Sequence, residues 1–255
     1  MKISVTIIVY NEEKKIRQCL ESVKNIADQI IVVDSFSEDS TLSICNEFSC
    51  KIYRHKFSDY IEQKRFADSK TNYDWILNID ADEKLSDELI DEIMKIKEKQ
   101  ELDYVAFKIP RKTFYINSWL NHCWYPDYKI RLYRKDLCEW TGVKLHEKIT
   151  VKSGSISRLC GNILHYSFDS ISEHLKKIDR FTELSLTEKP NNKITFFTIL
   201  WHSLWIFIKI YFLKQGFRDG INGFVVAFLS MVHVFVKYTK LRFYAETSKL
   251  TPLSH

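Results

Sequence analysis

The sequence has few residues that break regular structure, with 6 glycines and 4 prolines among 255 residues. This scarcity excludes a collagen-like repeat and a proline-rich linker. It also excludes Rossmann and Walker phosphate loops, because both need clustered glycines. The 6 cysteines are scattered without a CxxC pair, which argues against a structural zinc site. Since no signal peptide precedes them, we expect reduced thiols in a cytosolic compartment.

Positive charge is concentrated in the last quarter of the chain. Residues 1–190 contain 30 Lys and Arg against 31 Asp and Glu, a balance of −1. Residues 191–255 contain 8 basic and 2 acidic residues, a balance of +6, so the whole chain has a formal net charge of +5. This last quarter is also rich in aliphatic and aromatic residues. A basic, apolar tail favours an anionic membrane surface, and no nucleic acid, as the partner.

Apolar runs alternate with amphipathic segments over the first hundred residues. Apolar runs predict buried strands at Ile3–Tyr10, Gln29–Asp34 and Asp74–Asp80, and Lys51–His55 predicts a short strand between the second and the last of these. The segments between and after them predict helices over 11–25, 37–48, 59–70 and 87–99, with Asn11, Ser37 and Ser86 as N-caps. This alternation predicts an α/β fold with a doubly wound, mostly parallel sheet.

From Tyr104 the pattern changes to strands separated by irregular, aromatic segments. Strands are expected at Tyr104–Ile109, Tyr128–Arg134, Ile149–Lys152 and Ile156–His165, followed by a helix over 170–188. We expect this half to complete the sheet and to build the acceptor side of a binding site.

The tail contains two uncharged segments, Ile194–Ile208 with 15 residues and Ile221–Val236 with 16. Each is shorter than the roughly 20 residues that span a bilayer. They fit either two core helices packed on the sheet domain or a dimer partner, or two helices embedded in one leaflet. We favour the second, because their apolar arcs are wider than one packing face needs. A hairpin that spans the bilayer stays open if each helix is longer than its uncharged core.

Polar residues follow three of the predicted strands at their carboxyl ends, where ligands bind in parallel α/β sheets. Asp80 and Asp82 lie two residues apart and can point to the same side. Paired carboxylates of this kind bind a divalent cation whose other ligands come from a nucleotide diphosphate. Alternatively, they belong to an acidic loop that caps the next helix. Asp34 could accept hydrogen bonds from a base or ribose, or could cap a helix.

Three other groups are candidates for chemistry. His146 and Glu147 could supply a metal ligand and a general base, although exposed His-Glu pairs are usually inert. Arg131, Arg134 and Lys135 could neutralise a pyrophosphate leaving group or be solvated. His165, at the end of an apolar strand, is interpreted as a core histidine.

Several of these motifs together resemble glycosyltransferase family 2, and within it the enzymes that extend the bacterial lipopolysaccharide core. The matching segments are Ser4–Glu12 (SVTIIVYNE), Val32–Thr41 (VVDSFSEDST), Asp74–Glu83 (DWILNIDADE), Tyr125–Arg134 (YPDYKIRLYR), His146-Glu147 and Leu164–Ser167 (LHYS), in the order of that subgroup. The tail segments Tyr211–Gly220 and Lys237–Leu241 are similar to its membrane-facing end.

The resemblance implies a GT-A fold, an inverting mechanism and a nucleotide-sugar donor bound with Mn²⁺ or Mg²⁺. It implies that Glu147 is the base that deprotonates the acceptor hydroxyl, with His146 beside it, and that Asp82 and Asp80 bind the metal. It further implies contacts to the donor from Tyr10, Asn11, Glu12, Asp34, Lys64, Asp80 and Arg131.

The domain organisation that follows is a GT-A domain over 1–190 and a membrane-associating helical tail over 191–255. Residues 1–100 would bind the nucleotide-sugar and residues 101–190 the acceptor. The implied reaction moves a hexose, such as glucose from UDP-glucose, to a lipid-linked saccharide at the cytoplasmic face of the inner membrane. Alternatives are a polyprenyl phosphate or peptide acceptor, or a catalytically silent nucleotide-sugar-binding membrane protein.

Two residues depart from the family pattern. Phe36 replaces the usual glycine, and Arg65 stands where asparagine is common. Because phenylalanine adopts a positive φ only with strain, we expect the Asp34 loop to be reshaped and the donor preference to change. Arg65 is expected to contact phosphate or to face solvent.

Overall fold

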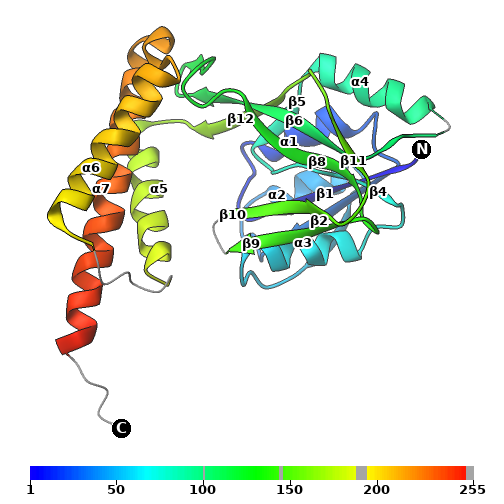
Figure 1. Cartoon of the computed structure of the whole chain (residues 1–255). Helices are drawn as coiled ribbons and strands as arrows, with labels where there is room; N and C mark the ends of the chain where they lie inside the picture. Colours follow the sequence, from blue (N-terminus) through cyan, green and yellow to red (C-terminus); the bar gives the residue numbers. More distant parts are fainter. Residues whose placement is uncertain (100, 144–145, 188–193, 251–255) are drawn as a thin grey trace. The chain divides into compact units, whose positions relative to one another are not determined.

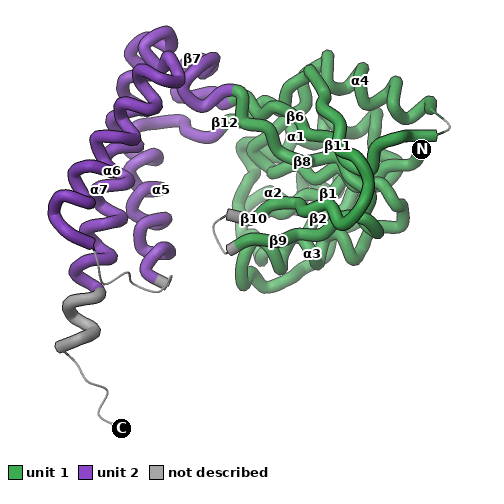
Figure 2. The backbone as a smooth tube through the Cα atoms, in the orientation of Figure 1, with its two compact units in different colours: residues 1–112, 126–166 green, residues 113–125, 167–255 purple. Residues whose placement is uncertain are grey.

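The computed structural model describes residues 1–99, 101–143, 146–187 and 194–250 (Figure 1). The chain divides into two compact units, residues 1–112 with 126–166 and residues 113–125 with 167–255 (Figure 2). We call them the sheet unit and the helical unit. The sequence predicted a different boundary, at residue 190, between a catalytic domain and a membrane-associating tail. That functional boundary stays a prediction.

The predicted α/β fold is confirmed, with a mixed, mostly parallel sheet flanked by helices. The strand order is β3-β2-β1-β4-β8-β6-β12-β5, and β7 and β11 pair with β6. Strands β1 to β4 are parallel, and β8 joins β4 antiparallel. The bounds are β1 Ile3–Val9, β2 Gln29–Asp34, β3 Lys51–Arg54, β4 Trp75–Asn78, β5 Glu83–Leu85, β6 Tyr104–Tyr115, β7 Ser118–Trp119, β8 Asp127–Arg134, β11 Ser155–Arg158 and β12 Ile163–Phe168.

Strands β9 (Cys138–Val143) and β10 (His146–Val151) form a separate antiparallel hairpin. The sequence predicted the second half of β10 but not β9. Strand β9 contains Gly142, the exposed Glu139 and the half-buried Thr141, so its composition differs little from that of a loop.

Four helices pack on the sheet of the sheet unit: α1 Ile16–Val23, α2 Thr41–Glu47, α3 Tyr60–Ser69 and α4 Asp87–Glu98. The apolar face of α4, with Leu89 and Ile93, is buried against the sheet core as its spacing predicted. Ser86 caps α4 and Asp59 caps α3, each by accepting a hydrogen bond from a first-turn amide.

The first two helices begin later than predicted, at residues 16 and 41 instead of 11 and 37. Asn11 and Ser37, the predicted N-caps, bind each other's loops. The backbone N–H of Asn11 donates to Ser37 Oγ, and the side-chain oxygen Oδ1 of Asn11 accepts from the backbone N–H of Glu38. These polar groups therefore join the loops after β1 and β2.

The helical unit contains α5 Ile171–Leu184, a 3₁₀ turn at Ser185–Thr187, α6 Phe196–Ile208, a π-helical turn at Lys209–Leu213, a second 3₁₀ turn at Gly216–Asp219 and α7 Gly220–Leu250. Lys240 on α7 forms ion pairs with Asp179 and Glu183 on α5, at 2.8 and 2.6 Å. Asp219 lies just before α7, and its carboxylate accepts hydrogen bonds from the backbone amides of residues 121–123 and from His122 Nδ1.

Two helical stretches of this unit, Phe196–Leu213 and Gly216–Tyr244, are long and apolar enough to cross a bilayer by length and composition. Each helix is longer than its uncharged segment. The alternative of a helical hairpin that crosses the bilayer was conditional on this, so it remains an alternative. Few of their apolar side chains are buried, and several large ones are exposed, including Phe197 at 80% and Trp201 at 67%.

Candidate active site

The loops after β1 and β2 meet at the carboxyl ends of two neighbouring parallel strands. Tyr10 is exposed there, whereas the side chain of Asp34 is fully buried. Asp34 accepts hydrogen bonds from the backbone amides of Phe36 and Ser37, at 3.1 and 3.0 Å, and lies 3.8 Å from Arg54 Nε. Its carboxylate therefore shapes its own loop, and its predicted contact with the nucleoside stays a prediction. The same holds for Tyr10, Asn11 and Glu12.

Phe36 adopts a φ of 67°, the left-handed conformation that favours glycine. We expected phenylalanine to reshape this loop. For the backbone of residue 36 that expectation is wrong, because the backbone keeps the conformation that glycine would adopt. Two hydrogen bonds to Asp34 hold the loop in the glycine-like conformation despite the strain. The ring is 52% exposed, and a change in donor preference stays a prediction.

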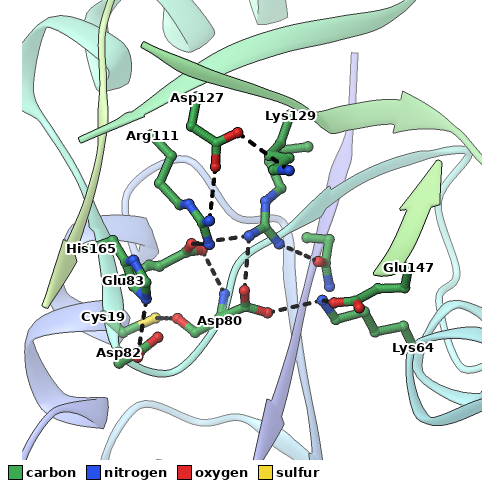
Figure 3. A network of polar contacts seen from close by, with 12 residues as sticks. Cys19, Lys64, Asp80, Asp82, Glu83, Arg111, Asp127, Lys129, Glu147 and His165 are labelled. Atoms are coloured by element: carbon green, nitrogen blue, oxygen red, sulfur yellow. Dashed lines mark hydrogen bonds and ion pairs between the residues drawn. The ribbon is translucent and has the colours of Figure 1, made fainter. Parts of the chain in front are cut away.

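Helix α3 connects this edge to the carboxylates that follow β4. Gln63 donates to Ser35 Oγ at 2.9 Å, in the loop after β2. The next residue, Lys64, is only 3% exposed and lies between two carboxylates (Figure 3). Its Nζ is 3.1 Å from Asp80 Oδ1 and 3.0 Å from Glu147 Oε1. The structure thus brings together three of the predicted site residues through one ammonium group.

Arg131 binds the other oxygen of Asp80, with its Nη2 2.8 Å from Oδ2. Burial alone would raise the pKa of Asp80, but the positive charges of Arg131 and Lys64 outweigh it and hold the pKa well below its ordinary value. Burial lowers the pKa of Arg131, and the charges of Asp80 and Glu83 raise it by more. Asp80 and Arg131 are therefore both charged at neutral pH.

Glu83 is a central member of this network that the sequence did not single out. Its side chain is fully buried, accepts from the Asp80 amide at 3.0 Å and lies 3.0 Å from Arg131 Nη2. Arg111, from β6, lies 3.6 Å from Glu83 and pairs with Asp127 at 2.8 Å. A buried glutamate in a run of four acidic or small residues looks like a solvated loop residue in the sequence, so its role depends on contacts from β6 and β8.

Asp82 points to a different neighbour, with its Oδ2 3.3 Å from His165 Nε2 (Figure 3). The interpretation of His165 as a core histidine is therefore wrong. Antiparallel pairing of β12 with β5 sets His165 opposite Glu83 and so beside Asp82. A carboxylate and an imidazole fit a divalent transition-metal ion such as Mn²⁺ when a diphosphate supplies further oxygens. Within the described residues, no three His, Cys, Asp or Glu side chains gather into a metal site of their own.

Several predicted candidates lie elsewhere. The side chain of His146 lies outside the described part of the chain, so its role stays a prediction. Arg134 pairs with Asp136, and Lys135 donates to Thr71, so neither is the expected pyrophosphate contact in this structure. Arg65 is exposed, as one of its two expectations stated, and its Nη2 also donates to the backbone oxygen of Trp140; a contact with phosphate stays a prediction.

This arrangement has the parts needed for displacement at an electrophilic carbon. One carboxylate, Glu147, is partly exposed and held by Lys64. The neighbouring Lys64 and Arg131 place positive charge around Asp80, where an anionic leaving group can be accommodated. A general base and a stabilised leaving group are the two requirements of a group-transfer site.

Comparison with known proteins shows which family the sequence matches. The family model described as glycosyl transferase family 2 matches residues 4–151. The chain is 34% identical to an uncharacterized glycosyltransferase of Rickettsia typhi, RT0209, over 94% of this chain and 87% of the relative. It is 24% identical to the lipopolysaccharide core biosynthesis glycosyltransferase LpsC of Rhizobium meliloti, over 94% of this chain and 92% of the relative. Among solved structures, TarS 1–349 of S. aureus in complex with UDP-GlcNAc is 16% identical, with a TM-score of 0.49 and coverage of 97% of this chain and 92% of that one.

Proposed function

The chain belongs to glycosyl transferase family 2, and we propose that it transfers a hexose, such as glucose, from a UDP-sugar to a hydroxyl group of a lipid-linked saccharide of the lipopolysaccharide core type. The observation that carries this proposal is the position of Lys64, which holds Glu147 beside Asp80. It joins a base to a donor-binding carboxylate. The similarity to LpsC supports the class of acceptor.

The donor would bind along the carboxyl edge of the sheet. Tyr10, Asn11, Glu12 and Asp34 would contact the nucleoside from the loops after β1 and β2, which hydrogen bonds join into one surface. Lys64 and Arg131 would surround the diphosphate together with Asp80. Because these cations are already paired with carboxylates, the donor's charge would need further compensation.

A divalent cation, Mn²⁺ or Mg²⁺, would supply that compensation by neutralising the leaving diphosphate. Asp82 and His165 are the residues that fit it, since they face each other at 3.3 Å. Asp80 was predicted as a second ligand. Both of its oxygens are paired with cations, which favours Asp82 as the principal carboxylate ligand.

In the transfer step, Glu147 would take the proton of the acceptor hydroxyl. The hydroxyl oxygen attacks the anomeric carbon, and a new carbon–oxygen bond forms as the bond to the diphosphate oxygen breaks. UDP leaves with the electron pair, and the configuration at the anomeric carbon inverts. Lys64 would orient Glu147 for this step, because it restrains one carboxylate oxygen.

The apolar helices α6 and α7 would bring the enzyme to its lipid-linked acceptor. Their exposed aromatic residues include Trp201 and Trp205, a type that settles at the level of lipid headgroups. Basic residues Lys209, Lys214 and Arg218 lie in and near the turns between the helices, where they would meet anionic lipids. We place the enzyme at the cytoplasmic face of the inner membrane, with the tail embedded in one leaflet.

Metal-dependent UDP release from a panel of UDP-sugars, with lipid-linked core saccharide as acceptor, tests the proposal. We expect release with one donor, its loss in EDTA and its loss in Asp82→Ala. Asp136→Ala removes an exposed carboxylate of the same unit and is expected to behave like the wild type. Nucleotide binding without release from any donor and acceptor would support a silent binding protein. Release only with polyprenyl phosphate or peptide would replace the proposed acceptor.

A further inference from the structure

The β9–β10 hairpin carries Glu147 but is not part of the main sheet (Figure 1). Glu147 is the second residue of β10 and pairs with Gly142 of β9. Because the hairpin forms its own two-stranded sheet, the ten-stranded sheet does not fix its place by a shared ladder. Side-chain contacts to the rest of the sheet unit must therefore position the proposed base.

Trp140 of β9 supplies three such contacts, all to one helix. Its Nε1 donates to Asp68 Oδ2 at 3.0 Å, and its backbone oxygen accepts from Arg65. The ammonium of Lys64 lies 4.9 Å from the centre of its ring. The three partners are residues 64, 65 and 68 of α3, so this short stretch of helix adds polar contacts to the apolar packing of the hairpin on the main sheet.

Asp68 joins the hairpin to the main sheet as well. Its Oδ2 also accepts from the hydroxyl of Tyr133 on β8, at 2.7 Å. Its Oδ1 is buried and has no hydrogen-bond partner among the described residues. An asparagine could accept the same two hydrogen bonds without burying a charge, so hydrogen bonding alone does not account for a carboxylate here.

The carboxylate also lies within electrostatic reach of the cation that the site uses. Asp68 lies four residues after Lys64, on the same face of α3, and the charge of Lys64 acts on it. Burial raises the pKa of Asp68 to about 7, against the lowering effects of its hydrogen bonds from Tyr133 and Trp140 and of the charges of Lys64 and Lys135. Its charge therefore changes near neutral pH. The ionised form accepts the stronger hydrogen bonds.

We propose that Asp68 is a positioning residue that, through Trp140, fixes the β9–β10 hairpin on α3 and so places Glu147 beside Lys64 and Asp80. This inference rests on the proposed function only for the role of Glu147. The ionised carboxylate holds the hairpin more firmly than the neutral one, so transfer depends on the charge of a residue that touches no substrate.

The test combines kinetics with hydrogen exchange of the hairpin amides in the full-length protein. Asp68→Ala is expected to lower kcat about 10- to 100-fold, to leave the donor KM within about twofold and to speed exchange over residues 138–143 and 146–151. Glu139→Gln, which removes an exposed hairpin carboxylate paired with Lys152, is expected to change neither.

Asp68→Asn separates charge from hydrogen bonding. In the wild type, kcat should fall as the pH drops below about 7, because Asp68 takes up a proton. The asparagine variant keeps both hydrogen bonds but not the charge, so its exchange should lie between that of the wild type and that of Asp68→Ala, and it should lose this step in the pH profile. If Asp68→Ala were to fold poorly, Trp140→Phe would remove the N–H and keep an aromatic ring at this position, and it should reproduce the faster exchange and lower kcat.

Unchanged exchange and a kcat within twofold in both Asp68→Ala and Trp140→Phe would overturn the proposal. So would a pH profile for Asp68→Asn that matches the wild type. If the wild type released no UDP from any donor, the proposed function would fail while the exchange measurements still decided whether Asp68 positions the hairpin.

Discussion

The sheet unit hides charged groups from water, whereas the helical unit exposes apolar ones to it. Arg131 and Glu83 have side chains 6% and 0% exposed, while Phe197 and Trp201 on α6 are 80% and 67% exposed. Each arrangement is unfavourable in water unless a partner compensates it. In the sheet unit the partners of the charges lie on the same chain. For the helical unit the proposed partner is a lipid surface, so chemistry is proposed for the first unit and lipid binding for the second.

The largest expected effect tests whether the charges of the sheet unit serve chemistry. Glu147→Gln keeps the shape of the side chain and removes its basicity, so kcat should fall about 10³-fold or more, within the range of general-base catalysis. Donor binding, measured by calorimetry, should stay within about twofold, because the amide oxygen can still accept from Lys64. Near-normal UDP release by this variant would show that another group is the base.

The next effect tests whether the buried charges depend on one another. Arg131→Met would leave Glu83 and Asp80 without their main partner and should lower the free energy of unfolding by about 3–5 kcal/mol. Urea unfolding measures this. Arg134→Met, which removes an exposed arginine paired with Asp136, should cost less than about 1 kcal/mol. Equal effects of the two substitutions would show that burial does not decide how much a charged group of this unit contributes to stability.

A smaller effect is expected for the apolar surface. The double substitution Phe197→Ser and Trp201→Ser should weaken partitioning into vesicles with anionic lipids about 10- to 100-fold, because it removes exposed apolar area. Flotation of the full-length protein with vesicles measures this. The matched control is Phe57→Ser, which changes an exposed aromatic residue of the sheet unit. Unchanged flotation of the α6 variant would argue that these helices pack on protein instead.

The smallest effect concerns strain. Phe36→Gly should raise the free energy of unfolding by roughly 0.5–1 kcal/mol, because glycine adopts a positive φ without steric conflict. Thermal unfolding of the two proteins, followed by circular dichroism, measures the difference. A lower Tm for the glycine variant would mean that packing of the exposed ring outweighs the strain of its backbone.

The strands and their carboxyl ends could be predicted from the sequence because their signals are local. An apolar run followed by Asp34 or Asp80 indicates a buried strand and a polar edge without knowledge of any other segment. The helix starts at Asn11 and Ser37 were wrong because each side chain binds the other's loop, 26 residues away. A capping residue in the sequence does not reveal such a competing partner.

In the candidate site, too, features with a local sequence signal could be predicted, and features that depend on distant segments could not. Roles for Asp80, Asp82 and Glu147 could be predicted from their motifs, whereas the contacts of Glu83, His165 and Asp68 could not. Their contacts depend on β5–β12 pairing and on the packing of α3 against β9, both of which join distant segments. A polar residue in an apolar strand, such as His165 in ILHYSF, was the one available signal, and it equally fits a core histidine.

The single ammonium group shared by Asp80 and Glu147 has a consequence for the order of events in a catalytic cycle. Once Glu147 accepted the acceptor's proton, it would be neutral, and Lys64 would be drawn to Asp80 and the departing diphosphate alone. The attraction between Lys64 of α3 and the proposed base Glu147 would then be weakest just after the new bond forms. Loss of that proton to water would restore the pair, so recovery of the resting site and departure of the product would be linked through one lysine.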